Sequence, residues 1–197
     1  MSETSRVEKI PLRDHEFTRK IRAEGMTNLD RCYQCSACSD GCPVAYAMDY
    51  YPHQLIYMVK LGLKEKVLES KTIWICVSCE TCATRCPNGI EIVRLMDVLR
   101  KESLKGGFKS PVNKIPKFHQ VFIKEIQKKG RVDEAGLLLN YELKTGDFLS
   151  LKKIREEGSL GLKMFRKGRL KLPSIKTKKI QGQKEVEEIF KKVLSHK

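Results

Sequence analysis

The chain has 197 residues, of which 41% are hydrophobic, enough for one domain with extensions or for two small domains. No apolar run approaches the roughly 18 residues that a membrane-spanning helix needs. The first residues, Met1 to Arg6, lack the apolar core of a signal peptide. We therefore expect neither a transmembrane nor a secreted protein, although peripheral association with a membrane stays open.

The formal net charge of +15 is concentrated in the second half of the chain. Residues 1–104 carry 15 Lys and Arg against 14 Asp and Glu, whereas residues 105–197 carry 24 against 10. Basic tails often bind nucleic acid, but this one lacks a basic motif interleaved with aromatic residues. Docking onto acidic partner proteins, or a solubilising surface, explains the charge better, and no nucleic acid partner is expected.

The first predicted element is a short helix over residues 14–24, with Asp14 as its N-cap and Gly25 as its stop. Phe17 and Ile21 lie four residues apart and therefore share one face of this helix. We take residues 1–30 as an N-terminal helical extension.

All eight cysteines fall in two copies of one pattern, 44 residues apart, in which the fourth cysteine precedes a proline. The copies are CYQCSACSDGCP at residues 32–43 and CVSCETCATRCP at residues 76–87. This run is the bacterial ferredoxin signature for a [4Fe–4S] cluster, and in two-cluster ferredoxins the fourth cysteine ligates the other cluster. We therefore predict two [4Fe–4S] clusters, one held by Cys32, Cys35, Cys38 and Cys86 and the other by Cys76, Cys79, Cys82 and Cys42.

Three other uses of the cysteines are weaker. Structural zinc usually takes two separated Cys-x2-Cys pairs rather than a triplet plus one. A disulfide framework needs a secreted context. A purely structural role, in which a cluster only stabilises the fold, is improbable when two clusters occur in tandem. Thiols kept for iron instead indicate a reducing compartment, so we predict a cytoplasmic protein.

The segment between the motifs has helical periodicity, which predicts a helix that begins after Pro52. Its apolar stripe consists of Leu55, Ile56, Val59, Leu63 and Val67. A second amphipathic helix follows Cys86-Pro87, with Ile92, Val93, Met96 and Leu99 on one face. Strand signals are weak, and residues 72–75 are too short to assign. We predict an α-helical ferredoxin module at residues 31–106, in which Trp74 and Tyr33 pack over the clusters to exclude water.

Gly106-Gly107 marks the predicted boundary to a basic C-terminal docking region at residues 107–197. A helix containing Phe118 and Ile126 is expected to end near Gly130, after which glycines at 136, 146, 158, 161 and 168 break the chain. Residues 166–179 are predicted to be extended, and residues 185–194 to form a short amphipathic helix. The predicted fold is thus mainly α, with an irregular basic C-terminal arm that has short helices and orders on a partner.

The sequence shows no catalytic constellation: its four histidines are scattered, and there is no glycine-rich phosphate loop or dinucleotide fingerprint. With every cysteine committed to a cluster, no thiol remains for disulfide chemistry. The chain is predicted to pass electrons without transforming a substrate itself.

The paired motifs at residues 32–43 and 76–87, separated by a helix, resemble the C subunit of heterodisulfide reductase. Tail stretches such as residues 118–122 and 161–170 are also similar to that family. The resemblance implies a relay of electrons from a flavin- and cluster-bearing A subunit to a B subunit whose CCG motifs build the disulfide-cleaving clusters. This chain has no CCG motif, so that chemistry must belong to a partner.

Two other functions remain open. The first is an iron–sulfur subunit of a membrane-bound quinone or respiratory oxidoreductase. Such subunits would carry an N-terminal [2Fe–2S] domain with further cysteines, and this sequence has none. The other is a cluster-stabilised nucleic-acid-binding protein, which the basic tail motivates.

Overall fold

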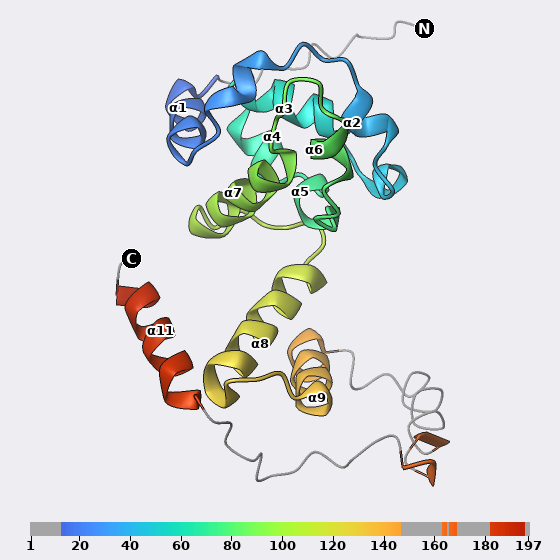
Figure 1. The fold of residues 1–197 in the computed structure, drawn as a ribbon, viewed down its shortest axis with the longest axis vertical. Coiled ribbons are helices and arrows are strands. Elements are labelled where there is room, and N and C mark those ends of the chain that lie inside the picture. The colour runs from blue at the N-terminus through green and yellow to red at the C-terminus, as the bar shows by residue number, and fades with distance from the viewer. Residues whose placement is uncertain (1–12, 147–162, 165, 169–181, 196–197) are drawn as a thin grey trace, which may run out of the picture. The chain divides into compact units, whose positions relative to one another are not determined.

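A computed structural model of the chain describes residues 13–146, 163–164, 166–168 and 182–195. These residues are mainly helical and include no strand, which confirms the predicted α class. The chain divides into two compact units, residues 1–113 and 114–197 (Figure 1). None of the described helices is long and apolar enough to cross a membrane.

In the first unit, each cysteine motif contains one short helix. Helices α2 (Ala37–Asp40) and α6 (Thr81–Arg85) begin at the same position of the two cysteine motifs and pack against each other. Its other elements are α1 (His15–Ala23), η1 (Thr27–Arg31), η2 (Ala45–Ala47), α3 (Pro52–Lys60), α4 (Lys64–Leu68), α5 (Thr72–Ile75) and α7 (Ile92–Lys105). Residues 72–75, too short to assign from sequence, are therefore helical.

Helix α1 confirms the predicted N-cap. The Asp14 carboxylate accepts a hydrogen bond from the Phe17 backbone N–H at 2.8 Å, satisfying a donor that has no partner within the helix. Phe17 and Ile21 are both buried, as their spacing predicted. Past the helix end, Gly25 takes a φ of +96°, a conformation that favours glycine.

The helix predicted after Pro52 is real but shorter than its apolar stripe, because it ends at Lys60 and α4 begins only at Lys64. Gly62 has a φ of +72°, and the N–H of Leu63 bonds to the carbonyl of Met58, which is the Schellman helix ending. A Cβ at Gly62 would lie 2.7 Å from the backbone oxygen of Asp14. The break therefore lets α1 approach the chain closely.

Helix α7 supplies much of the core, as predicted. Its apolar face is buried and consists of Ile92, Val93, Leu95, Met96, Val98 and Leu99. The helix ends in a second Schellman arrangement, with Gly107 at a φ of +68° and the N–H of Phe108 bonded to the carbonyl of Ser103. Ser103 in turn donates to the Leu68 carbonyl at 2.8 Å.

The second unit contains α8 (Lys114–Lys129), α9 (Glu134–Thr145) and α11 (Gln183–Ser195), with α8 packed against the other two. The predicted helix end at Gly130 and the closing helix are confirmed. The break predicted at Gly136 is wrong, because α9 runs through it. Among the described residues of this unit, only Val121 and Leu137 are buried hydrophobic side chains. Gly158, Gly161 and most of residues 166–179 lie outside the described residues.

Candidate metal centres

The two cysteine loops share an unusual backbone. Four residues that are not glycine have positive φ angles: Gln34 (63°), Ser36 (60°), Ser78 (54°) and Glu80 (60°). They occupy the same two positions of each motif. Such residues are uncommon in the left-handed region, at a cost of about 1–2 kcal/mol each. Alternating left-handed residues turn successive backbone N–H groups to one side and form a concave nest for an anion. The same strained loop is thus built twice.

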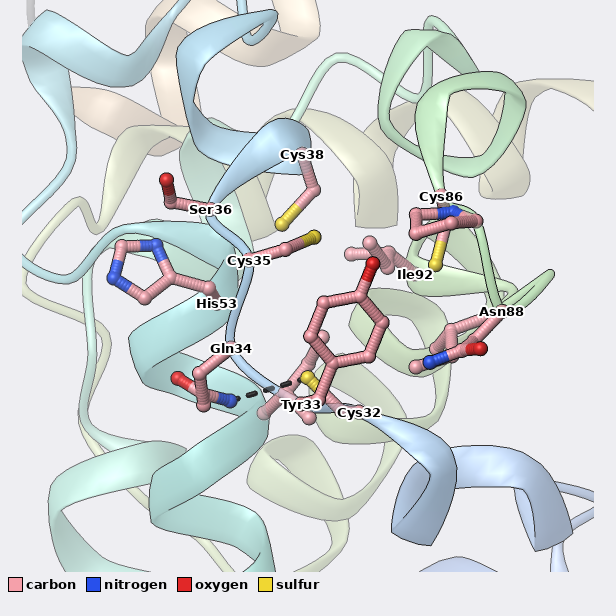
Figure 2. A pocket seen from close by; sticks show the side chains of 13 residues that line it. Cys32, Tyr33, Gln34, Cys35, Ser36, Cys38, His53, Cys86, Asn88 and Ile92 are labelled. Atoms are coloured by element: carbon pink, nitrogen blue, oxygen red, sulfur yellow. Dashed lines mark hydrogen bonds between the residues drawn. The ribbon is translucent and has the colours of Figure 1, made fainter.

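The first loop forms a hollow with Cys32, Cys35 and Cys38 on one side and Cys86 across from them (Figure 2). Its empty volume, including the part open to solvent, is about 330 Å³. Because its lining includes cysteines of both motifs, the hollow can hold a group that bridges the two motifs.

The second loop forms a matching hollow of about 340 Å³, lined by Cys76, Cys79, Cys82 and Cys42. Each hollow thus combines three cysteines of one motif with the fourth cysteine of the other, which is the grouping of the predicted ligand sets. Ile92, which begins α7, lines both hollows and is 1% exposed.

The donor set fits a cube-shaped cluster. All eight cysteines are free of disulfides, and thiolates are the ligands that iron–sulfur clusters take. Within the described part of the chain, no three His, Cys, Asp or Glu side chains converge on a single ion position. A cubane does not need that convergence, because each of its cysteines binds a different iron.

Burial and crowding disfavour the ionised form of Cys38 and Cys82. Burial raises the pKa of Cys38, and burial together with the neighbouring Cys76 raises the pKa of Cys82 to about 11. Cys79 is the exception: a hydrogen bond between its sulfur and the Thr81 hydroxyl, 3.4 Å apart, lowers its pKa. Thiols must lose their protons to bind metal, so loading these sites releases protons.

A basic side chain from the following helix supports the start of each loop. Lys60 Nζ, on α3, donates to the carbonyl of Cys32 at 3.2 Å. Arg100 Nη2, on α7, donates to the carbonyl of Cys76 at 2.6 Å, and its Nε donates to the carbonyl of Ile73. Sequence periodicity placed both residues off the apolar face and so missed this role.

The carboxylate of Asp49 holds residues 70–72, which lead into the second loop. Its carboxylate accepts hydrogen bonds from Ser70 Oγ (2.8 Å), Lys71 N (2.7 Å), Thr72 N (2.9 Å) and Thr72 Oγ1 (2.6 Å). Burial alone would raise the pKa of Asp49, but these bonds outweigh it and the pKa is lowered. No sequence signal distinguished Asp49 from other surface acids.

Two asparagines join the ends of the motifs. Asn28 Nδ2 donates to the carbonyl of Gly89 at 2.8 Å, and Asn88 Nδ2 donates to the carbonyl of Arg31. Each bond links the chain just before Cys32 to the chain just after Cys86. These bonds hold the fourth cysteine of the second motif beside the first loop.

The two aromatic residues predicted to cover the clusters differ in position. Tyr33 lines the first hollow while remaining 63% exposed. Trp74 is buried, at 3% exposure, but is not among the residues that line either hollow. Water exclusion by these two rings stays a prediction.

Comparisons with known proteins connect the cysteine region to iron–sulfur proteins. Residues 28–90 match the family model for a 4Fe-4S dicluster domain. The C subunit of the H(2):CoB-CoM heterodisulfide,ferredoxin reductase of Methanothermobacter marburgensis is 37% identical over 101 residues, 51% of this chain and 55% of the relative. The resemblance to the C subunit of heterodisulfide reductase is confirmed. Together with the cysteines, these findings support an iron–sulfur protein with 4Fe-4S clusters.

Two further relatives carry the same kind of name. The C subunit of the ferredoxin:CoB-CoM heterodisulfide reductase of Methanosarcina acetivorans is 38% identical over 52% of this chain and 40% of its own length. The Methanosarcina mazei protein of that name is 29% identical over 62% of this chain and 78% of its own length. The chain spans about half the length of the first of these relatives. Similarity of the tail to the family stays a prediction.

Proposed function

We propose that this chain relays electrons through two [4Fe–4S] clusters in a heterodisulfide-reductase-like complex. The carrying observation is the pair of hollows, each lined by three cysteines of one motif and the fourth of the other. In this proposal Cys32, Cys35, Cys38 and Cys86 hold one cluster, and Cys42, Cys76, Cys79 and Cys82 hold the second.

When bound, each cluster would accept and release one electron at a time. The chain's own residues would position the thiolates that hold it. The left-handed residues turn successive backbone N–H groups to one side of each loop, and Lys60 and Arg100 bond to the carbonyl that begins each loop. Ile92 lies at both hollows, which supports a short path between the two sites.

The proposed partners are two proteins of the heterodisulfide reductase type, one bearing a flavin and clusters like the A subunit and one bearing CCG motifs like the B subunit. The names of the relatives support a complex of several subunits. Since this sequence has no CCG motif, disulfide cleavage is assigned to the CCG-motif partner. The chain itself contributes no catalytic residue in this scheme.

Metal analysis tests the cofactor. Protein reconstituted without oxygen should hold close to eight irons and eight sulfides. After reduction, electron paramagnetic resonance (EPR) should show two interacting clusters. Stoichiometric zinc without sulfide would contradict the proposal.

Purification of the native complex tests the partners. Recovery of a flavoprotein and a CCG-motif protein with this chain is the expected result. Recovery of a haem-binding membrane protein instead would favour the iron–sulfur subunit of a membrane-bound quinone or respiratory oxidoreductase.

A further inference from the structure

The two hollows are lined differently although their loops are alike. Besides its cysteines and four apolar residues (Ile56, Pro87, Ile90 and Ile92), the first hollow is also lined by polar residues, namely Tyr33, Gln34, Ser36, His53 and Asn88 (Figure 2). Apart from its cysteines, the second hollow is lined only by apolar residues, among them Val44, Met48, Val77, Val93 and Met96. The two sites therefore offer a cluster different surroundings.

Contacts with the sulfurs add to this difference. Gln34 Nε2 donates a hydrogen bond to Cys32 Sγ at 3.1 Å, and Ser39 Oγ lies 3.8 Å from Cys38 Sγ. The second site has one side-chain contact of this kind, between Thr81 and Cys79. At Ser78, the position equivalent to Gln34, a serine replaces the glutamine.

Reduction adds one negative charge to a site. Hydrogen-bond donors to sulfur and a polar lining stabilise that charge, and both raise the reduction potential. An apolar lining stabilises it less. The cations that support the two loops favour the same order, because Arg100 at the second loop forms an ion pair with Asp97 at 2.8 Å, which offsets its positive charge.

We propose that the site of Cys32, Cys35, Cys38 and Cys86 has the higher reduction potential, so that the first electron taken up by the protein rests there. Gln34 is the residue that tunes this site. The inference rests on the proposed function. The step is the gain of one electron from a low-potential donor, with no bond broken and no proton required. Downhill transfer within the chain then runs from the Cys76 site to the Cys32 site.

The test is a redox titration of the full, anaerobically loaded chain with dithionite, followed by EPR. Two separate reduction steps are expected. Gln34→Leu removes the donor and leaves an apolar side chain that is one atom shorter. At a fixed solution potential, the reduced-to-oxidised ratio of the higher-potential site should fall by up to about tenfold. This corresponds to a reduction potential lower by about 59 mV for one electron. The lower-potential step should not move.

Ser78→Leu is the matched control, since it places the same side chain at the equivalent left-handed position, and it should move neither step. Ser78→Gln supplies the donor to the second loop and should raise the lower-potential step. If the Gln34→Leu protein does not bind iron, Ser78→Gln alone still tests whether a glutamine at this position raises the reduction potential. A single step in the wild type, a shift of the lower step by Gln34→Leu, or no shift with Ser78→Gln would each overturn the inference.

Iron and sulfide analysis separates the two levels of failure. Protein that binds no cluster contradicts the proposed function and this inference with it. Protein with two clusters whose potentials coincide, or fall in the opposite order, contradicts this inference alone.

Discussion

Cys42 and Cys86 each lie in the hollow lined by the other motif's cysteines. Cys42→Ala should therefore damage the cluster of Cys76, Cys79 and Cys82 and leave the Cys32 site loaded. Iron content should fall from about eight to about four per chain, which iron analysis and EPR would measure. Cys86→Ala is the control and should reverse the pattern. Loss of the Cys32 site in Cys42→Ala would show that each motif serves its own cluster.

Asp49 offers a test of the chain segment that leads into the second loop. Asp49→Asn replaces a carboxylate that accepts four hydrogen bonds from Ser70, Lys71 and Thr72. We expect the free energy of unfolding to fall by about 1–2 kcal/mol, a modest value because the carboxylate is partly open to solvent. Thermal or denaturant unfolding at neutral pH would measure it.

The pH dependence of this effect has a definite sign. The folded-state pKa of Asp49 is lowered, so its stabilisation is complete above the unfolded pKa and is lost as pH falls through the folded pKa. The difference between wild type and Asp49→Asn should stay constant from about pH 5 to about pH 8. A difference that shrinks within this range would contradict the lowered pKa.

Sequence alone located the eight cysteines, because their spacing carries the chemistry. It did not locate the supporting residues. Lys60 and Arg100 follow the polar side of their helices like any surface cation, and only the fold brings them to the Cys32 and Cys76 carbonyls. The positive φ at Gln34 could not be predicted either, because glutamine, unlike glycine, rarely adopts this conformation.

At the scale of the helices, Gly62 and Gly107 form a natural pair. Both end a helix in the Schellman arrangement with positive φ, but only Gly62 faces a neighbouring backbone, that of Asp14. Gly107→Ala should cost about 1–2 kcal/mol of stability, from backbone strain alone. Gly62→Ala should cost more, because the added Cβ must displace α1. Equal losses in thermal unfolding would show that the close approach does not matter.

The helical stripes predicted most elements, since α1, α3 and α7 bury the expected face, and α8 and α11 form where helices were predicted. The errors came from glycine, whose effect depends on its surroundings. Gly62 takes a positive φ and ends a helix, and its missing side chain leaves room for the backbone of Asp14, whereas Gly136 lies inside α9. Periodicity reports which side of a helix is apolar and cannot report a contact with a residue about fifty positions away.

For the whole molecule, the division at Asn113 suggests a clean truncation. A chain ending at Asn113 retains all eight cysteines and both hollows, so it should load fully with iron and sulfide. Its binding to partner proteins should weaken roughly tenfold, because most of the positive charge is lost. Pull-down with and without the tail would measure this, and added salt should weaken the intact complex. Normal assembly of the short chain would show that the tail is not the docking arm.

The same pair of chains tests the nucleic-acid alternative. If the tail binds DNA or RNA, the full chain should shift a nucleic acid probe, with affinity falling steeply in salt, and the short chain should not. We expect no such shift, since the exposed apolar residues Leu138, Leu143, Ile189 and Val193 in the second unit suit a protein surface better than phosphates.

The exchange of fourth cysteines between the motifs has a consequence for biosynthesis. The first hollow has only three cysteines until residue 86 has been made and Asn88 has bonded to Arg31. With the proposed ligand sets, a growing chain still on the ribosome cannot complete either set from the first motif alone. We then expect iron–sulfur delivery to wait until residues 28–90 have emerged and folded. Separating the two motifs into different polypeptides should leave both halves unable to retain a cluster.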